Sequence, residues 1–420
     1  MRCASARSST NNCSRFTRAP DVRSSSPRSA SLMITVLHLV TSLTRAGAES
    51  QLASLVRNTA SAELSHIVCY LHRPDDLAPE LRKSGIETIC LDLPRKWPWL
   101  VAPWKLVPLL RARRPDFLQT RLLDADLSGR LSTILGPSIP IINTLHMPTY
   151  DAETIRAAGW PPHKMAVLQR LDRWTARATT PRFIAISESV KRSAVRNLGL
   201  RAEDIRVIYN SIDPAILQCH PDEPSRIRKD AGIPSGAFVY LNVARLSPEK
   251  GQPVLLRAFK EVAASVAEAY LVIAGDGPRA AAYQTLATEL GIHDRVRFLG
   301  SRTDVGACLE MADAFVFPSL FEGLGSASIE AMVKGRACIA SRIEAMLEVF
   351  VDGKTGLLVT PGCEAALASA MMTLYRDPDL CRRLGASARA AALERFDSRQ
   401  GIKAWSQFYG ELASLTKTMA

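Results

Sequence analysis

The feature that most limits the fold of this chain is a regular alternation of short, continuous apolar runs with longer amphipathic segments such as 48–58. Strands that are apolar along their whole length and separated by helices are typical of a parallel sheet covered on both faces. The first series of predicted strands comprises 34–40, 66–71, 86–91, 116–122, 140–146 and 183–187. The second comprises 238–244, 270–275, 296–300, 314–319, 337–341 and 355–359.

The two series indicate two domains, as the length of 420 residues also suggests. A segment rich in Pro, Asp and Arg, 210–234, lies between them and is typical of a linker. We therefore predict an α/β fold of two doubly wound, Rossmann-like domains over 33–213 and 214–420, the second ending in helices such as 403–415. Ligands of such sheets bind outside the carboxyl ends of the strands, so the domains should face each other across a cleft.

The N-terminal segment 1–32 is rich in Ser and Arg and has few apolar side chains, which predicts disorder. Its composition is superficially that of an organellar transit peptide. Met33, however, opens a run typical of a buried strand, and we favour it as the natural start of the protein.

The net charge of +12 is concentrated in the first half of the chain. Residues 1–32 carry six Arg and one Asp (+5), residues 33–213 carry 24 basic and 17 acidic residues (+7), and residues 214–420 carry 23 of each. A basic first domain favours an anionic partner such as a membrane surface. Nucleic acid is not an expected partner, because the sequence has no helix-turn-helix, zinc-finger or base-stacking motif.

Hydropathy and cysteine usage indicate a cytoplasmic protein. No apolar run in the sequence approaches the ~20 residues that span a bilayer. The nine cysteines are scattered singly, without zinc-binding spacing, as is typical of reduced thiols.

The segment 318–330, PSLFEGLGSASIE, carries the strongest functional signal. A predicted strand ends here, a loop with Gly323 and Gly325 follows, and then a helix is expected to begin. Amides at a helix N-terminus are suited to bind a diphosphate, and glycines let the backbone approach it. Glu322 and Glu330 are separated by seven residues, and a carboxylate one turn into the helix can accept two vicinal hydroxyls, as on ribose. The alternative for Glu330 is a favourable interaction with the helix dipole alone.

Two further loops follow predicted strands of the second domain. Arg245 and Lys250 lie within 242–251, and two cations at the carboxyl end of a strand are suited to hold a leaving diphosphate. A solvated turn is the alternative. The tight turn 275–278, GDGP, is a weak signal by itself.

Together these motifs resemble those of the retaining glycosyltransferases of family four, which share the two-domain GT-B fold. The resemblance covers 33–415 and is carried by RLSPEKG, IAGDGP, VRFLG, ADAFVFPSLFEGLGSASIEAM, VDGKTGLLV and IYNSID. It implies a nucleotide-sugar donor, a glycan or lipid-linked acceptor, and transfer with retention of configuration. No metal or other cofactor is implied.

The resemblance also assigns roles to residues of the second domain. It implies that Arg245 and Lys250 bind the donor diphosphate and that Glu330 binds its ribose. The residues that would face the donor sugar and phosphate are Glu322, Gly323, Leu324 and Gly325.

In the first domain, the loop 41–50 resembles the family's Gly-Gly-Ala-Glu loop, which approaches the donor phosphate and the acceptor. Ala46 replaces the first glycine, and Gly47 is retained. His146, at the end of a predicted strand, stands where the family places a histidine near the donor sugar. We assign it, with Glu322, to the catalytic groups, with a purely structural role as the alternative.

Two segments depart from the family pattern. Residues 344–348, EAMLE, stand where the family has two glycines before Pro-Glu, and Arg336 with Ala337 replaces a small residue and a proline. A glutamate at a turn that faces the sugar predicts an altered donor choice or a blocked sugar pose.

Asp124 and Asp126 form a D-x-D pair, the metal-binding signature of a different, single-domain glycosyltransferase fold. The groups that bind phosphate are expected in the other domain. We therefore interpret the pair as N-capping the following helix rather than as a metal site.

The segment 93–115 combines three of the six tryptophans with six basic residues and no acid. Tryptophan favours the membrane interface and basic side chains favour anionic headgroups, so the segment predicts peripheral membrane binding. The alternative is a packed helix between two strands, shortened by its prolines, with its tryptophans in the core.

Other functions on similar folds remain as alternatives. A nicotinamide-dependent dehydrogenase is disfavoured, because 42–50 lacks the G-x-G-x-x-G loop between the first strand and helix. A sugar-nucleotide epimerase would bind the nucleotide similarly but would need additional acids and bases. A catalytically inactive scaffold would not need Arg245, Lys250, Glu322 and Glu330 together.

Overall fold

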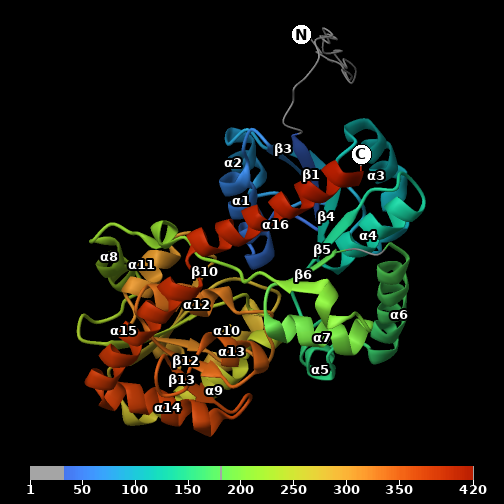
Figure 1. Ribbon diagram of the computed structural model, residues 1–420. Coiled ribbons are helices and arrows are strands. Elements are labelled where there is room, and N and C mark those ends of the chain that lie inside the picture. Colours follow the sequence, from blue (N-terminus) through green and yellow to red (C-terminus); the bar gives the residue numbers. More distant parts are fainter. Residues whose placement is uncertain (1–32, 180–181, 420) are drawn as a thin grey trace, which may run out of the picture.

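Two parallel sheets, each flanked by helices, form the frame of the molecule (Figure 1). The computed structural model describes residues 33–179 and 182–419, so the expected disordered extension 1–32 lies outside the described residues. The prediction of two doubly wound α/β domains is confirmed.

The first sheet has the strand order β3-β2-β1-β4-β5-β6-β7. The order reverses between β1 and β4, which places the ligand-binding crevice of this domain at the carboxyl ends of these strands. The strands are β1 Ile34–Val40, β2 Leu64–Tyr70, β3 Glu87–Cys90, β4 Phe117–Arg121, β5 Ile141–Leu145, β6 Arg182–Ala185 and β7 Ile205–Val207.

The second sheet has the order β10-β9-β8-β11-β12-β13, which reverses between β8 and β11. Its strands are β8 Phe238–Val243, β9 Ala269–Ala274, β10 Val296–Gly300, β11 Ala314–Phe317, β12 Ala337–Ser341 and β13 Leu357–Val359.

The helices that belong to the first half of the chain cover both faces of the first sheet. They are α1 Gly47–Thr59, α2 Ala78–Lys83, α3 Pro98–Arg113, α4 Leu123–Ile134, α5 Ala152–Ala158, α6 Pro162–Thr179 and α7 Glu188–Leu198. The later helices are α8 Glu223–Asp230, α9 Gln252–Ser265, α10 Ala280–Glu289, α11 Val305–Glu310, α12 Ser326–Val333, α13 Glu344–Val349, α14 Glu364–Arg376, α15 Pro378–Arg395 and α16 Ser398–Met419.

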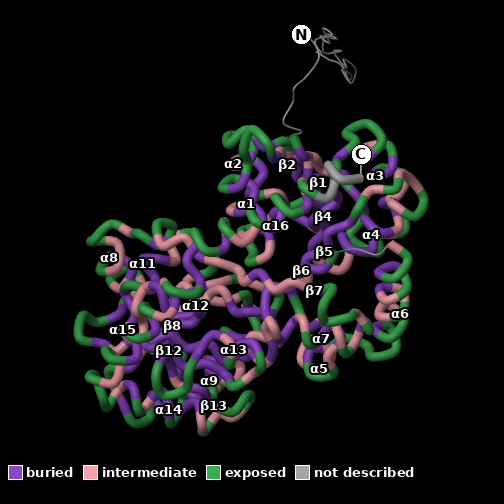
Figure 2. Tube along the Cα trace, in the orientation of Figure 1, coloured by how far each residue is buried: buried purple, intermediate pink, exposed green. Residues whose placement is uncertain are grey.

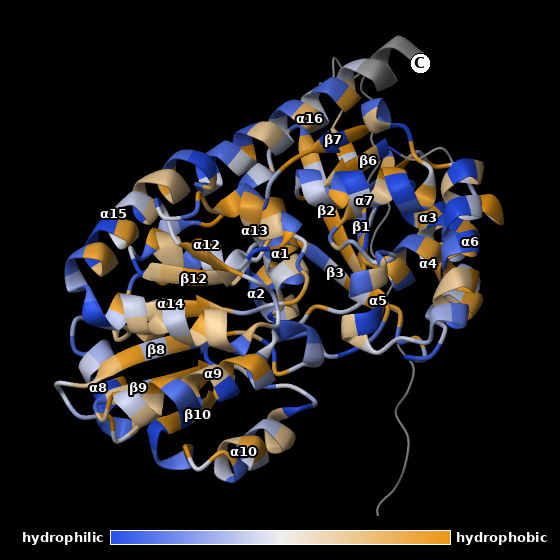
Figure 3. Ribbon diagram, turned by 90° about the horizontal axis from the view of Figure 1, so that it is seen from below, coloured by the Kyte–Doolittle hydropathy of each residue, from blue (hydrophilic) through white to orange (hydrophobic). Residues whose placement is uncertain are grey.

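The strands lie in the apolar interior, which explains their continuous hydrophobic sequences. All five residues of β4, all five of β12 and all four of β11 are buried. Figure 2 shows the buried positions concentrated on the strands, and Figure 3 shows that the strands are mainly hydrophobic while the surrounding helices mix both characters. Among the described residues, no helix is long and apolar enough to cross a membrane.

The last helix does not stay with the second domain, contrary to the expected division at 213. Phe408, Tyr409 and Leu412 of α16 pack with Val36 and Ile142 in the core of the first sheet. The chain therefore passes between the domains twice. The two passages are hydrogen bonded, since the Ile212 amide donates to the Phe396 carbonyl at 2.8 Å.

Two local predictions were wrong. The predicted linker 210–234 contains helix α8 and the short 3₁₀ turn Pro214–Leu217. Helix α3 runs for 16 residues through both Pro103 and Pro108, so the prolines do not shorten it. Each proline removes a backbone donor, a loss that tertiary packing of Leu106 and Leu110 offsets here.

Candidate functional site

Three loops of the second domain meet at the carboxyl ends of β8, β9 and β11. A Cβ on Gly251 would lie 2.1 Å from the Pro318 carbonyl oxygen, and one on Gly275 would lie 2.0 Å from the Ala244 carbonyl oxygen. The Leu320 amide donates to the Glu249 carbonyl at 2.8 Å. Only glycine permits these close approaches, so loops that lie far apart in the sequence pack into one unit, the cation platform.

The platform presents two cations in different settings. Arg245 is exposed. Lys250 is half-buried, and its Nζ lies 2.6 Å from Oε1 of Glu322, a carboxylate that is only 10% exposed. The ion pair positions Lys250 over the loop that follows β11. Both cations thus lie at the strand ends, where the sequence predicted them.

The loop after β11 leads into the N-terminus of α12. Gly325 has a φ of +80°, a left-handed conformation that favours glycine, and it precedes the first residue of the helix. The Leu324 side chain is buried in the core, so only its backbone could face a ligand. The helix begins without a side-chain cap, and its first amides are suited to bind an anion.

Glu330 lies in the second turn of α12 and is partly buried. Desolvation raises the pKa of its carboxyl from 4.5 to about 7. A carboxyl group whose pKa is raised by desolvation alone is typical of binding sites, where a ligand supplies the missing hydrogen-bond donors.

The first domain contributes the N-terminus of α1. A Cβ on Gly47 would meet no atom within 4 Å, so the absence of a side chain leaves open space there. Glu49, in the same turn, is buried beside Ser42 and Thr44. Burial raises its pKa, while the charge of Arg245 opposes that rise, which places the α1 loop opposite the cation platform.

His146 joins the two domains. A Cβ on Gly323 would lie 2.0 Å from the His146 carbonyl oxygen, so the α12 loop packs directly on the end of β5. Burial and the charge of Arg121 lower the pKa of the imidazole to about 3, which keeps it neutral. Its Nε2 is buried and has no hydrogen-bond partner. The structure therefore places His146 beside the predicted sugar-facing loop.

A group of contacts at the N-terminus of α7 was not predicted from the sequence. Ser187, the N-cap residue, donates from Oγ to the Gly323 carbonyl at 2.6 Å. Glu348 of the second domain accepts hydrogen bonds from the amides of Glu188 and Ser189, at 2.8 and 2.5 Å. A carboxylate at a helix N-terminus is favourable, and here it comes from the other domain. The serine pattern could have indicated the cap, but not its partner.

Both glutamates of 344–348 contact helix α7 of the first domain. Glu344 forms ion pairs with Arg192 and Arg196 of α7, at 3.1 and 3.7 Å. These contacts direct it towards the first domain. The altered donor choice or blocked sugar pose stays a prediction, and Glu344 adds exposed ion-pair contacts between the domains. Arg336, the other departure, donates to the Ala312 carbonyl at 3.0 Å, within the second domain.

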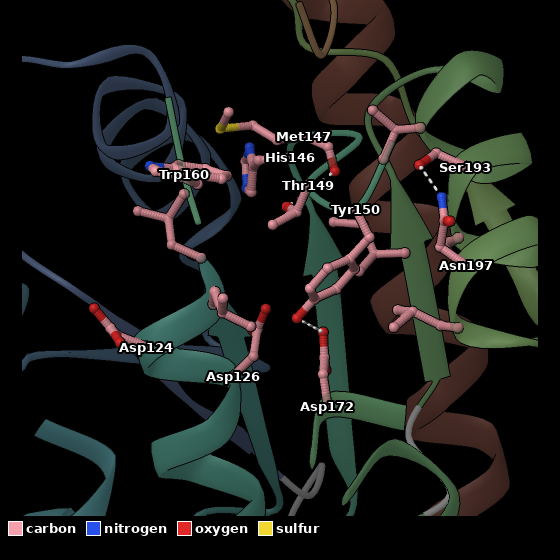
Figure 4. Close-up of a pocket in the computed structure, with 16 residues that line it drawn as sticks. Asp124, Asp126, His146, Met147, Thr149, Tyr150, Trp160, Asp172, Ser193 and Asn197 are labelled. Carbon is pink, nitrogen blue, oxygen red and sulfur yellow. Dashed lines mark hydrogen bonds between the residues drawn. The ribbon is translucent and has the colours of Figure 1, made fainter. Parts of the chain in front are cut away.

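A cavity of about 260 Å³ lies in the first domain, between the ends of β4 and β5 and the helices α6 and α7 (Figure 4). His146 and Trp160 are among its lining residues. Asp124 and Asp126 also line it, and neither caps α4, whose N-cap is Leu122. Asp126 accepts from Asn143 Nδ2 at 2.6 Å, so the capping interpretation was wrong. Among the described residues, no group of three or more His, Cys, Asp or Glu side chains is arranged to hold a metal ion.

Comparison with known families gives two matches that follow the two domains. Residues 45–216 match the model described as Glycosyltransferase Family 4, and residues 224–391 match Glycosyl transferases group 1. The chain is 37% identical over 205 residues to a lipopolysaccharide core biosynthesis glycosyltransferase, LpsD, of Rhizobium meliloti. It is 30% identical over 253 residues to the protein EpsD of Bacillus subtilis. These matches cover 49% and 60% of the chain and span 57% and 66% of the two relatives.

Solved structures share the whole architecture. HepE of Anabaena, crystallised with UDP and glucose, has a TM-score of 0.78 at 22% identity, with 90% of this chain and 100% of HepE covered. WaaG, a glycosyltransferase of lipopolysaccharide biosynthesis, has a TM-score of 0.69 at 16% identity, with 88% and 98% covered. At these identities the likeness establishes the fold.

Proposed function

Because the chain belongs to the family-four, group 1 glycosyltransferases and has their GT-B fold, we propose that it transfers a sugar from a nucleotide-sugar donor to a glycan or lipid-linked acceptor. The observation that carries the proposal is the constellation of Arg245, Lys250 and Glu330 around the ends of β8 and β11. Two cations and a helix N-terminus suit a diphosphate, and a carboxylate one turn further suits a ribose.

In the proposed reaction, Arg245, Lys250 and the α12 amides stabilise the charge that develops on the departing nucleoside diphosphate. His146 and Glu322 lie beside the donor sugar and orient it. The acceptor hydroxyl attacks the anomeric carbon as its bond to the phosphate oxygen breaks, and the leaving phosphate takes the proton. Configuration is retained, as the family implies.

A screen of UDP-, GDP- and ADP-sugars for release of the nucleoside diphosphate tests this function and identifies the donor. Transfer or donor hydrolysis is the expected result. A nucleotide-sugar returned with one inverted sugar carbon would instead favour the epimerase alternative.

Glu330→Gln should weaken binding of the nucleoside diphosphate about ten- to a hundred-fold, because a charged hydrogen-bond acceptor contributes about 1.5–3 kcal/mol. In the unmodified protein, affinity should fall as pH drops through about 7, since protonation removes that acceptor. The variant should show no such step. Calorimetric titration between about pH 5.5 and 8.5, roughly one and a half units on either side of that pKa, measures both effects.

The same substitution should stabilise the unliganded protein. The folded-state pKa of Glu330 lies above the unfolded value, so ionisation destabilises the fold as pH rises from 4.5 to about 7. At pH 8 the variant should therefore melt higher than the unmodified protein. Glu289→Gln, an exposed change on α10, is the matched control. Unchanged nucleotide affinity in Glu330→Gln would remove the ribose assignment.

We also propose that the reaction needs no metal ion, because cationic side chains and backbone amides of the protein neutralise the negative charge of the diphosphate. Activity is expected to survive a strong chelator such as EDTA at unchanged turnover. Activity that disappears with EDTA and returns with a divalent cation would show that a metal ion participates.

We further propose that the protein works at the cytoplasmic face of an anionic membrane, through an exposed aromatic and basic surface on α3. Trp97 and Trp104 are 68% and 82% exposed, and Leu100 and Val101 beside them are also exposed. The alternative in which the tryptophans fill the core is wrong for these two, whereas Trp99 is partly buried. The surrounding exposed cations are Arg95, Lys96, Lys105, Arg111, Arg113 and Arg114. Large exposed aromatics rimmed by basic side chains suit an anionic lipid interface.

The double substitution Trp97→Ala with Trp104→Ala should weaken binding to anionic vesicles by about tenfold or more, since burying a large apolar side chain contributes about 1.5–3 kcal/mol. Co-sedimentation with phosphatidylglycerol vesicles at low and high salt measures this. Ile216→Ala, which removes an exposed apolar group from the second domain, is the control. A protein that ignores these vesicles at low salt would argue for a soluble acceptor.

A further inference from the structure

We propose that Gln51 is a positioning residue for glycosyl transfer, because it ties the donor-facing end of α1 to the first chain segment that joins the two domains. The inference rests on the proposed function and adds a residue that acts on the donor site through a neighbouring backbone. Three observations carry it, namely the pairing of Gln51 with Ser211, the packing of α16 on Ser211, and the position of the α1 loop opposite Arg245.

The side-chain amide of Gln51 binds both backbone polar groups of Ser211. Its Nε2 donates to the Ser211 carbonyl at 2.8 Å, and its Oε1 accepts from the Ser211 amide at 3.3 Å. Gln51 lies in the second turn of α1, whereas Ser211 lies in the first passage between the domains, 160 residues later. Because one side chain meets the donor and the acceptor of the same residue, it fixes that residue more firmly than a single hydrogen bond would.

The first turn of α16 also packs on Ser211. Gly401 is buried there, and a Cβ on it would lie 2.2 Å from Ser211 Oγ and 2.8 Å from Ser211 Cβ. The neighbouring residue Ile212 is bonded to the Phe396 carbonyl of the second passage. Figure 1 shows α16 running past α1, and the two helices are in contact. Ser211 therefore touches α1 and α16 at the point where the chain crosses between the domains.

Helix α1 connects this junction to the donor site. Gln51 lies about one helical turn after Gly47, the residue that opens α1 and leaves free space beside it. Glu49, between them, is near enough to Arg245 of the second domain for that charge to oppose the rise of its pKa. Backbone hydrogen bonds make a single helical turn stiff, so a shift of Gln51 should move the α1 loop with it.

Apolar packing alone would hold α1 on the sheet without fixing its N-terminus to the junction. Leu52, Ala53 and Val56 are buried in the core of the first domain, so α1 should stay folded when the Gln51 hydrogen bonds are lost. The α1 loop would then be free to shift relative to the cation platform. A displacement of about 1 Å near the reacting atoms can reduce turnover by about 100-fold.

Gln51→Leu tests the inference, because it nearly preserves the size of the side chain and removes both hydrogen bonds. Turnover with saturating donor should fall about tenfold or more. Affinity for the nucleoside diphosphate should not change, since its proposed ligands lie in the second domain. The donor screen supplies the sugar nucleotide for the rate measurement, and calorimetric titration uses the matching nucleoside diphosphate. Gln284→Leu, an exposed change on α10, should affect neither quantity.

Gly401→Ala perturbs the same pair from α16. The added methyl group should displace Ser211, and with it the backbone groups that Gln51 binds, so turnover should again fall. Combining it with Ser211→Gly removes the clashing atoms and keeps those backbone groups. The double variant should therefore recover the turnover of Ser211→Gly alone. Gly410→Ala, on the same helix, is the matched control, because a Cβ there meets no atom within 4 Å.

Normal turnover in Gln51→Leu would overturn the inference, as would a loss in Gly401→Ala that Ser211→Gly does not relieve. A parallel loss of diphosphate affinity in Gln51→Leu would also overturn it, by showing a general structural role. A failure of the proposed function is distinguishable, because it would appear in the unmodified protein. If that protein turns over none of the sugar nucleotides, glycosyl transfer is wrong and the role of Gln51 in it falls too.

Discussion

Arg245→Ala and Lys250→Ala should each reduce turnover by about 10²–10³-fold, the effect typical of removing one group that stabilises developing negative charge. Both cations are proposed to act on the leaving diphosphate, whose charge grows in the transition state, so turnover should fall more than donor affinity. Steady-state rates with saturating donor measure this directly.

The two variants should differ in stability, which makes the pair informative. Arg245 is exposed, so its removal should leave the melting temperature unchanged. Loss of Lys250 leaves Glu322, only 10% exposed, without its partner at 2.6 Å, a change that costs about 1–3 kcal/mol. Lys260→Ala, an exposed change on α9, is the control for both. Near-normal turnover in a folded Arg245→Ala protein would exclude Arg245 from leaving-group stabilisation.

Gly323→Ala should reduce turnover by about 100-fold or more, because the added methyl group cannot coexist with the present contact between the domains. Its Cβ would lie 2.0 Å from the His146 carbonyl oxygen, and backbone atoms cannot move aside as a flexible side chain can. A displacement of about 1 Å at a reacting group is enough for a loss of this size. Each domain should still fold, because the clash lies between them.

Small-angle scattering tests the cause of the Gly323→Ala defect, since a more open arrangement should increase the radius of gyration. Gly236→Ala is the matched control, because a Cβ at Gly236 meets no atom within 4 Å. A Gly323→Ala enzyme with normal turnover and unchanged dimensions would mean that the contact with His146 is not part of the active arrangement.

The parts of the fold that the sequence predicted well are those determined locally. Continuous apolar runs located the strands, and β1, β10 and β12 begin and end at the predicted residues. β7 was missed because three residues, Ile205–Val207, are too few to establish a period. Tight turns and a strand followed by a glycine loop likewise indicated the cation platform and the α12 loop.

The features that the sequence did not predict depend on contacts between distant residues. Glu348 binds the N-terminus of α7 from 160 and 159 residues away, and no local pattern encodes such a pairing. The exposure of Trp97 and Trp104 could not be predicted for the same reason. An amphipathic pattern does not say whether a neighbouring element covers the apolar side chains. Asp126 was misread because its partner Asn143 lies on the next strand.

The return of α16 to the first domain has a mechanical consequence. A single connecting segment would let one domain swivel freely about it. Here the two crossing segments pair side by side, through the bridge between Ile212 and Asp397 and the bond from the Ser398 amide to the Ile212 carbonyl at 3.0 Å. Two adjacent anchors suppress twisting and leave bending as the easy motion. Any opening of the domains should therefore follow one path, along which Gly323 returns to the carbonyl of His146.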